Sequence, residues 1–337
     1  MHSSIKHHAR QHRLFYIISV ILLIFIVVAG YANYRTMIAA RKSFYTTTLE
    51  RQSLSELNLY HESSSALAGQ YFRGAIDAIT NLASDQTMQQ QLVSNSSAAL
   101  ITTLGQQRMI SSKFDSLTIL TANGTIAGYS SNKGNSPIGS DASKTASFMS
   151  GKDASGTILL SAHASPINRI IVSVASPIRD KNNKLLGVAV GGLTLQTVAE
   201  QIKLNSQYNT DLTSLLTDSD GNVLVWQDKP ANGLINLKDK EPGLAALMRQ
   251  QALPSTQEYN FEQKDSLAQG SVIDFKNTGK LYLVSFYNRG GYEKRLKDAV
   301  QDINVTFSSF VVRNSLLFLS AMLLIGIIIR VHEKRAS

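Results

Sequence analysis

The sequence predicts an α+β protein in which a long N-terminal helix is followed by two antiparallel-sheet lobes in tandem, flanked by two transmembrane helices. Three observations predict this arrangement. An uncharged apolar run lies near each end of the 337 residues, a helical period without proline follows the first run, and a strand–turn–strand pattern occurs twice. A chain of this length usually forms more than one compact module, which agrees with two lobes.

The first apolar run covers residues 14–32 (LFYIISVILLIFIVVAGYA) and contains no charged side chain. As a helix it is long enough to cross a hydrocarbon core of about 30 Å. A cleaved signal peptide is the alternative, because a basic stretch precedes the run. The run exceeds the usual signal core, and its last four residues form a poor cleavage site, so we expect an uncleaved anchor after a short tail, 1–13.

The second apolar run, 315–329 (SLLFLSAMLLIGIII), is short for a span by itself. Apolar neighbours and a snorkelling Arg313 extend it, so we predict a second transmembrane helix over 313–331 and a tail over 332–337. The alternative is a buried C-terminal helix. Basic residues after the run, including Lys334 and Arg335, are typical of a stop-transfer sequence and favour the span.

The net charge of +9 lies mostly beside these runs. Residues 1–32 and 313–337 each carry +3, and the 280 residues between them hold 26 basic and 23 acidic side chains. Such basicity suits anionic headgroups, so we expect the lipid bilayer and no nucleic acid as a partner. An even number of spans places both tails on one side, and positive-inside counting favours the cytoplasm, although three basic residues lie just outside the first span.

A helix is predicted from Tyr34 to about Leu92, running on from the first span. The stretch contains no proline, and apolar residues recur at three- and four-residue spacing. They are Leu67, Tyr71, Phe72, Ala75, Ile79 and Leu82. The same pattern fits a rod that carries displacement across the membrane and a helix that merely packs on a core.

The period then changes to that of strands. Residues 117–126 read as a hairpin, because Asn123-Gly124 supplies the positive φ angles of a tight turn. Two further β-rich runs, 170–178 and 185–195, form a second hairpin, and 196–204 reads as a short helix.

The strand–turn–strand pattern returns in 215–225, where Gly221 follows Gly124 by 97 residues. This repetition suggests two similar lobes, a membrane-distal lobe at about 90–200 and a membrane-proximal lobe at about 205–295. A last strand, 280–287, and a helix, 292–310, lead to the second span, so the domain between the spans covers 33–312.

This order resembles the double Cache family of bacterial extracytoplasmic sensor domains, whose lobes are PAS-like. The similarity extends over about 35–312 and rests on a long helix and five short motifs. The motifs are Thr121-Ala-Asn-Gly124-Thr, Gly139-Ser-Asp141-Ala-Ser143 with Phe148, Ser173-Val-Ala-Ser-Pro177-Ile-Arg-Asp180, Leu186-Gly187-Val-Ala-Val-Gly191-Gly and Thr217-Asp-Ser-Asp-Gly221-Asn-Val.

The resemblance implies a receptor that binds a small molecule in the distal lobe. The candidate ligand-binding residues are those that fall on the positions of that pocket in the family, namely Tyr129, Lys144, Thr145, Phe148, Ser161 and His163. Amino-acid-binding members carry an Arg and an Asp where this chain has Lys144 and Gly192. Without these two charged anchors for the ligand's carboxylate and amine, we expect a ligand other than a free amino acid.

The sequence offers little chemistry for an enzyme. It has no cysteine, nucleophile elbow, phosphate loop or zinc signature, so we expect no catalysis, no cofactor and no metal. The histidines His2, His7, His8 and His12 fit a basic tail better than a metal site. Residues 218–222 resemble the start of a calcium loop, but Lys229 stands where its final Glu would be. His61 and His163 are isolated in the sequence.

The expected function is membrane-anchored small-molecule sensing in bacterial signal transduction, with the main domain periplasmic or extracellular and both termini cytoplasmic at the inner membrane. Because the tails are short, we expect signalling through a homodimer or a separate histidine kinase, diguanylate cyclase or chemotaxis signalling protein. The alternative is a membrane-tethered structural or assembly subunit of an envelope complex, without a small ligand.

Overall fold

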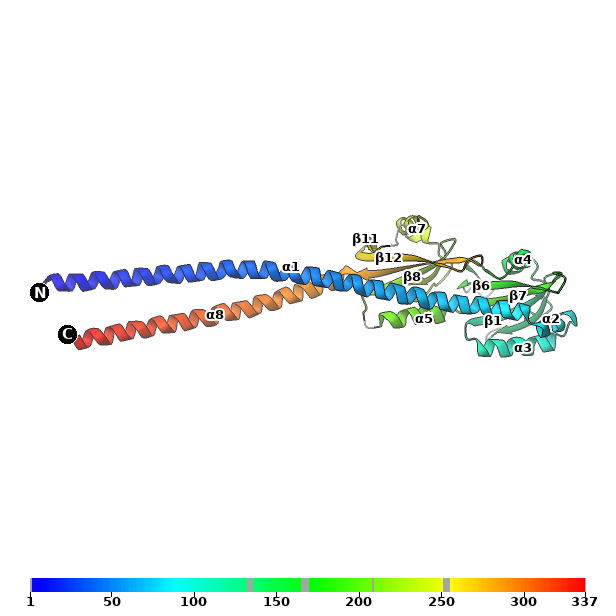
Figure 1. Cartoon of the computed structure of the whole chain (residues 1–337), viewed down its shortest axis with the longest axis horizontal. Helices are drawn as coiled ribbons and strands as arrows, with labels where there is room; N and C mark the ends of the chain where they lie inside the picture. Colours follow the sequence, from blue (N-terminus) through cyan, green and yellow to red (C-terminus); the bar gives the residue numbers. More distant parts are fainter. Residues whose placement is uncertain (1, 132–135, 165–169, 208, 251–254, 337) are drawn as a thin grey trace. The chain divides into compact units, whose positions relative to one another are not determined.

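The computed structural model describes residues 2–131, 136–164, 170–207, 209–250 and 255–336, and some side chains within the terminal helices, including those of residues 2–16, lie outside the description. The chain divides into two compact units, one formed by Met1–Gln52 with Gly291–Ser337 and the other by Ser53–Gly290. Figure 1 shows the helices and strands in sequence colours.

The first unit consists of helix, supplied by the start of α1 (His2–Ser84) and by α8 (Arg289–Ala336). The ring of Tyr34 stacks on that of Phe307, with centroids 3.5 Å apart, and its hydroxyl donates to the side-chain oxygen of Asn304 at 2.8 Å. Among the residues that the structure describes, none of the helices has a stretch that is both long and apolar enough for a membrane span. The spans at 14–32 and 313–331 stay predictions.

The described residues of the second unit form two large antiparallel sheets and one small one, and the two large sheets confirm the predicted α+β class with two lobes beside one long helix. The helices of the first lobe are α2 (Gln86–Val93), α3 (Ser97–Ile110) and α4 (Ala146–Asp153). Its five-stranded sheet has the order β2-β1-β7-β6-β3, with β1 (Phe114–Thr121), β2 (Ile126–Ser131), β3 (Ile158–Leu159), β6 (Ser173–Arg179) and β7 (Leu185–Leu193). A two-stranded sheet, β4 (His163–Ala164) with β5 (Ile170–Ile171), follows β3.

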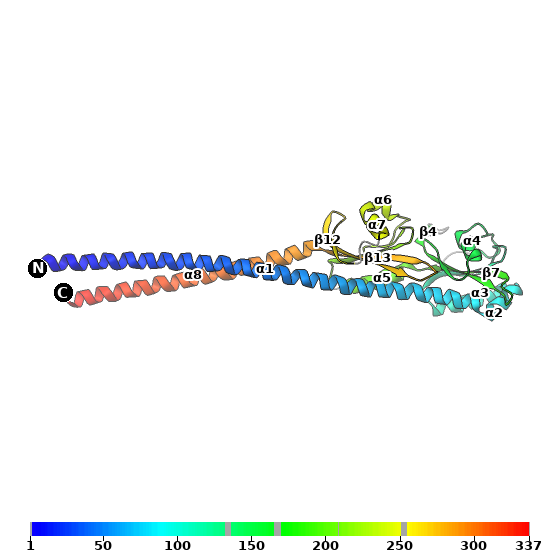
Figure 2. The same cartoon turned by 45° about the horizontal axis from the view of Figure 1, so that its top comes forward.

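The second lobe follows helix α5 (Leu195–Ser206) and contains α6 (Leu237–Lys240) and α7 (Pro242–Arg249). Its six-stranded sheet has the order β10-β9-β8-β13-β12-β11. The strands are β8 (Leu212–Asp218), β9 (Val223–Trp226), β10 (Lys229–Pro230), β11 (Gln257–Phe261), β12 (Lys264–Asp274) and β13 (Lys280–Asn288). Helices α6 and α7 cover one face of this sheet, and α1 and α5 lie on the other (Figure 2).

The repeated turn predicted from the sequence is a repeat of backbone structure. Gly124 and Gly221 have φ angles of +89° and +84°, and their N–H groups donate to Thr121 and Asp218. In each lobe the carbonyl of the turn glycine then accepts an N–H from the segment ahead, Ala142 in the first and Leu237 in the second. The two lobes therefore share one local design, in which only glycine suits the left-handed position.

The long helix ends earlier than predicted. It breaks at Asp85, whose carboxylate accepts the backbone N–H groups of Thr87 and Met88 and thereby caps α2. A side chain that satisfies the first N–H groups of a new helix makes the break favourable. Helices α3, α4, α6 and α7 were not anticipated, because each is short or weakly periodic. The predicted hairpins, the helix after β7 and the final strand are confirmed.

Candidate functional site

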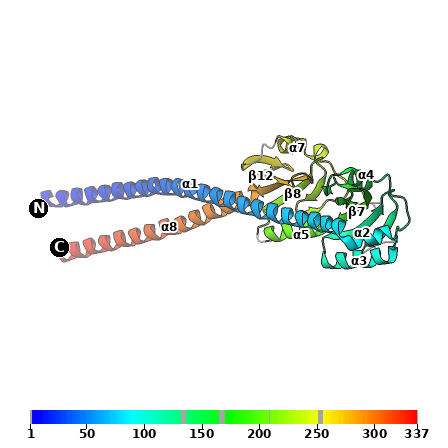
Figure 3. The same cartoon turned by 45° about the vertical axis from the view of Figure 1, so that its right-hand side comes forward.

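The sheet of the first lobe has two different faces (Figure 3). A side chain at Gly191 would meet Phe114 and Ile79, so this position faces α1. Its neighbour Gly192 faces the opposite side, since successive residues of a strand alternate. Helix α4 packs on that opposite side, where Phe148 joins Val188 and other apolar residues in a buried cluster. The α4 face is therefore the side of the sheet that carries the predicted residue Phe148.

Helix α4 begins at a side-chain cap. The hydroxyl of Thr145 accepts the backbone N–H of Phe148, which fixes the first turn and directs Phe148 into the core. Just before it, the Asp141 carboxylate accepts the N–H of Ser143 at 2.8 Å, and this hydrogen bond lowers the pKa of Asp141. Lys144 is exposed beside the cap, so its ammonium group is hydrated.

Along the strands, the α4 face changes from apolar to hydroxyl-bearing. Val188 and Leu120 lie at the apolar end, in the cluster with Phe148. Two rows of paired residues cross the sheet beyond them. The first row contains Tyr129, Thr118, Val190 and Ala175, and the second contains Ser131, Ser116, Gly192 and Ser173. The second row carries three hydroxyl groups and no charge.

The Ser116 side chain fills the space beside Gly192 in the second row. A Cβ atom built at this position would lie 2.9 Å from the Oγ of Ser116, on the strand beside it. Ser116 is half-buried and Ser173, the partner on the other side, is buried. A small ligand at this place would meet hydroxyl groups, which both donate and accept hydrogen bonds.

The six predicted site residues are not all brought together. Thr145 and Phe148 lie on the first turn of α4, Lys144 precedes them, and Tyr129 lies in the first row of the same face. Ser161 and His163 lie on the segment after β3, where the Ser161 carbonyl is 3.0 Å from His163 Nδ1. The sequence reasoning missed Ser116, Thr118 and Ser173. The alternation of side chains along the strands predicts which residues share a face of the sheet. It does not predict on which face α4 packs.

Ser161 makes its contacts with the second lobe. Its hydroxyl donates to the carboxylate of Asp220, and the N–H of the next residue, Ala162, donates to Asp218 at 2.7 Å. The Asp218 carboxylate also accepts the backbone N–H groups of Asp220 and Asn222. The turn that resembled a calcium loop therefore serves as a hydrogen-bonded joint between the lobes.

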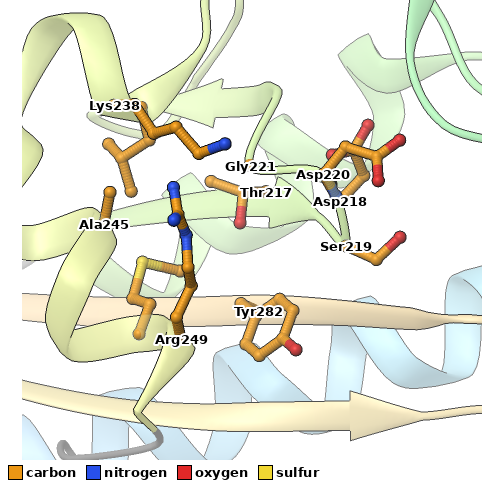
Figure 4. Close-up of a pocket in the computed structure, with 11 residues that line it drawn as sticks. Thr217, Asp218, Ser219, Asp220, Gly221, Lys238, Ala245, Arg249 and Tyr282 are labelled. Atoms are coloured by element: carbon orange, nitrogen blue, oxygen red, sulfur yellow. Dashed lines mark hydrogen bonds between the residues drawn. The ribbon is translucent and has the colours of Figure 1, made fainter.

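A small pocket lies beside this turn in the second lobe (Figure 4). Its volume is about 40 Å³, enough for a few water molecules. Lys238 and Arg249 extend from α6 and α7 into the space beside the turn, and Tyr282 closes it from β13. Because both basic side chains are exposed and Asp218 is fully hydrogen-bonded, the pocket has weaker claims as a ligand site than the α4 face.

Helix α1 is tied to the second lobe by buried hydrogen bonds. Tyr60 donates its hydroxyl to Asp228 Oδ1 at 2.8 Å, and the same carboxylate accepts the N–H and hydroxyl of Ser214 and the hydroxyl of Ser206. Burial, followed by the charge of Asp228, raises the pKa of Tyr60, which keeps its proton on the phenol. Within the part of the chain that the structure describes, four donors thus hold this buried carboxylate and no cation pairs with it.

His61, the next residue of α1, is also buried. Its Nδ1 lies 3.0 Å from the hydroxyl of Ser285 on β13, and burial lowers its pKa to about 4. The ring is therefore neutral at pH 7. Its Nε2 has no hydrogen-bond partner among the described residues.

No group of metal-ligating side chains occurs in the described part of the chain. The side chains of His2, His7, His8 and His12 lie outside the described residues.

Comparison with known proteins identifies what this arrangement is similar to. No family model matches the chain. Over 108 residues, the sequence is 30% identical to the methyl-accepting chemotaxis protein McpA of Pseudomonas putida, a match that covers 32% of this chain and only 16% of that protein.

Solved structures show the same fold over a larger share of the chain. The ligand-binding domain of the Pseudomonas fluorescens chemoreceptor CtaA, in complex with L-serine, has a TM-score of 0.55 and 20% identity, covering 72% of this chain and 99% of that one. The ligand-binding domain of the Pseudomonas aeruginosa chemoreceptor PctB, in complex with L-Gln, has a TM-score of 0.54 and 22% identity. This match covers 69% of the present chain and 90% of the PctB chain. The ligand-binding domain of PctC from the same species, in complex with GABA, has a TM-score of 0.51 and 18% identity. This match covers 69% of the present chain and 98% of the PctC chain.

Proposed function

We propose that this chain, which has the double Cache fold of bacterial chemoreceptor ligand-binding domains, senses a small molecule outside the cytoplasm in bacterial signal transduction. The observation that carries the proposal is the α4 face of the first-lobe sheet. There an apolar cluster around Phe148 adjoins the hydroxyl groups of the second row, where Ser116 lies against the backbone of Gly192. Ligand pockets typically combine apolar walls with a few directed polar groups.

The proposed ligand is a small molecule other than a free amino acid. CtaA, PctB and PctC were solved with L-serine, L-Gln and GABA, each of which carries an amine and a carboxylate. In this chain the two rows beside α4 carry no charge, and Lys144 is exposed to water. An uncharged, hydroxyl-bonding ligand matches Ser116 and Ser173 better, since a charged group needs a partner when it is desolvated.

Ligand binding is tested on the full chain in detergent micelles with a panel of organic acids, amines, nucleobases, sugars and the common amino acids. We expect a thermal shift with an uncharged polar compound and none with an amino acid. Replacing Ser116 or Ser173 by alanine should weaken that binding about tenfold, the effect of one directed hydrogen bond. Ser150→Ala, an exposed change on α4, is the matched control. A shift with an amino acid would disprove the ligand class, and no shift across the panel would disprove the sensing role.

The anchoring proposal rests on exposed apolar side chains in the terminal unit. The exposed fractions are 61% for Ile21, 70% for Phe25 and 68% for Leu323. Many other large apolar side chains on the same helices are also exposed. Large apolar surfaces of this kind mark sites that contact a membrane or another protein. We assign residues 14–32 and 313–331 to two spans of the inner membrane, with both termini cytoplasmic and the main domain periplasmic or extracellular.

This topology can be measured directly because the chain has no cysteine. A membrane-impermeant maleimide should label Ser150→Cys in intact spheroplasts and label Ser4→Cys only after the membrane is broken. Labelling of both in intact spheroplasts would disprove the topology.

For output, we propose a homodimer that acts on chemotaxis machinery, a histidine kinase or a diguanylate cyclase. The likeness to chemoreceptors supports a signalling role rather than catalysis. Photocrosslinking from helix α8 in native membranes, followed by identification of the adduct, tests it. Adducts with lipid alone would contradict the proposal.

A further inference from the structure

The second-lobe sheet has an open edge along half of β12. Strand β11 pairs with β12 only over Lys264–Ala268, whereas β13 pairs with it over Ser266–Asp274. Within the described residues, no strand continues beside the second half of β12. Unpaired backbone groups of this kind are a template for another extended chain.

The direction of each backbone group follows from the hairpins at the two ends of β12. Phe261 and Lys264 close a two-residue turn, so the outward-pointing residues are Lys264 and every second residue after it. The bond from the Phe275 N–H to the Gly279 carbonyl, 3.0 Å long, gives the same alternation from the other end. The N–H and C=O groups of Gly270, Val272 and Asp274 therefore point to the open edge.

A groove of about 520 Å³ lies at this edge, between α1 residues from His61 to Arg73 and β12 residues from Ser271 to Asp274. Helix and strand run in the same direction along it. Near one end the hydroxyls of Ser65 and Ser271 are 3.2 Å apart, and further along Gly69 faces Ile273. The absence of a side chain at Gly69 keeps the helix close to the strand.

The groove has opposite charges at its two ends. Glu62 lies at the start and Arg73 at the other end, both are exposed, and neither forms an ion pair with another described residue. Their eleven-residue separation corresponds to about 16 Å along a helix. An extended chain of about five residues has the same length.

Unpartnered buried groups lie at the Glu62 end. His61 lines the groove and is only 4% exposed, yet its Nε2 has no partner, and the side-chain oxygen of Gln269 also has none. Gln269 is in register with Ser285, which contacts the other nitrogen of His61. Both groups therefore lie on the α1 side of the sheet, where a missing hydrogen-bonding molecule would satisfy them.

We propose that this groove binds a short oligopeptide of about five residues, extended and parallel to β12. Its main chain pairs with Gly270, Val272 and Asp274, its terminal amine meets Glu62, and its carboxylate meets Arg73. Main-chain pairing supplies affinity with little dependence on side chains. The site is separate from the α4 face of the first lobe and does not depend on the function proposed for it.

The test uses pentaalanine with free termini and the full chain in detergent micelles, measured by calorimetry. We expect a Kd at or below about 1 mM. Val272→Pro removes an N–H that is used in the pairing of β12 with neither β11 nor β13, and proline is tolerated at sheet edges, so the variant should fold and should weaken binding at least tenfold. Val272→Ala keeps the N–H and is the matched control. Equal affinities for these two variants, or no binding by the unchanged protein, would overturn the proposal.

A second arm keeps the proposal testable if Val272→Pro fails to fold. Arg73→Gln should weaken binding of the free peptide about tenfold, because a charge-assisted hydrogen bond is lost. It should leave the affinity for a C-terminally amidated peptide unchanged. If Arg73→Gln weakened both peptides equally, or neither, the assigned orientation would be wrong and the proposal overturned. Ser116→Ala, in the first lobe, should not alter peptide binding.

Discussion

Helix α1 makes two different kinds of contact with the two lobes. Against the first lobe it is mainly apolar, with Ile79 fully buried against Gly191, although Tyr71 also donates its hydroxyl to the carbonyls of Lys113 and Thr194. Against the second lobe it adds buried side-chain hydrogen bonds from Tyr60 and His61 to the apolar contact of Phe72 with Phe275. One helix thus combines apolar contacts, whose free energy depends on the buried area, with hydrogen bonds, whose free energy depends on the direction of the bond.

The difference separates two ways of holding a helix. Apolar burial is non-directional, so a small rotation or slide changes its free energy little as long as the area stays covered. A hydrogen bond weakens steeply when its angle changes, and a buried unpaired group costs more than the bond contributed. The hydrogen bonds of Tyr60 and His61 therefore restrict the register of α1 more tightly than the apolar packing around Ile79 does.

The largest effect is expected at the polar contact. Asp228→Ala leaves the donors of Tyr60, Ser214 and Ser206 buried without an acceptor, so the free energy of unfolding should fall by about 3 to 4 kcal/mol. Urea unfolding, monitored by the fluorescence of Trp226, measures this loss of unfolding free energy. Trp226 is the single tryptophan and lies in the same lobe. Asp265→Ala, at an exposed residue of β12, should change little. Similar losses for both variants would contradict a directional anchor.

The apolar contact should respond next. Ile79→Ala removes a fully buried side chain that fills the space above Gly191, and a loss of about 2 to 4 kcal/mol is expected from burial and the cavity left behind. Circular dichroism during urea unfolding measures it for the whole unit. Leu59→Ala, on the same helix but 70% exposed, is the control. If Ile79→Ala were as mild as Leu59→Ala, the first lobe would not depend on this packing.

The polar contact should also be sensitive to acid. Burial lowers the pKa of His61 to about 4, below the unfolded value of 6.5, so the unfolded chain binds the proton more readily. Stability is therefore fully present above pH 6.5 and falls as the pH drops towards 4, by about 2 kcal/mol between pH 7.5 and pH 5.

Urea unfolding at both pH values measures this loss, and His61→Gln should remove that part of it. His163→Gln, at a half-buried histidine of the first lobe, should retain it. An unchanged pH dependence in His61→Gln would show that another group is responsible.

The smallest effect is expected from Tyr60→Phe, which removes one of the four donors to Asp228 and should cost about 1 kcal/mol. A double-mutant cycle with Asp228→Ala sharpens the comparison, because residues that share a hydrogen bond should show a coupling of at least about 0.5 kcal/mol. Additive losses would mean that the hydroxyl contributes nothing through this carboxylate.

Much of the fold was predictable because it depends on local signals. Asn123-Gly124 and Gly221 marked the turns that the two lobes share, and alternation marked β13. The end of α1 was misplaced because its apolar period continues past Asp85, and only the capping bonds to Thr87 and Met88 reveal the break.

The candidate site was predictable only in part. Thr145 and Phe148 were named because they follow a motif of the family that the chain resembles, and they lie together at the start of α4, while their role in binding stays a prediction. Ser161 was placed with them on the same grounds, although its hydroxyl bonds with Asp220 of the other lobe. Sequence neighbours share a site only when the fold turns their side chains to the same side.

By itself, the sequence determined the α+β class, the repeated turns and the apolar terminal runs, since periodicity and glycine conformation act over a few residues. Only the tertiary arrangement places Ser116, Gly192 and Ser173 in one row, buries Ile79 against the first-lobe sheet and brings Tyr60 to the buried carboxylate of Asp228 in the second lobe. Strand order and helix register join residues far apart in the chain. Such pairings depend on long-range packing, which no local pattern encodes.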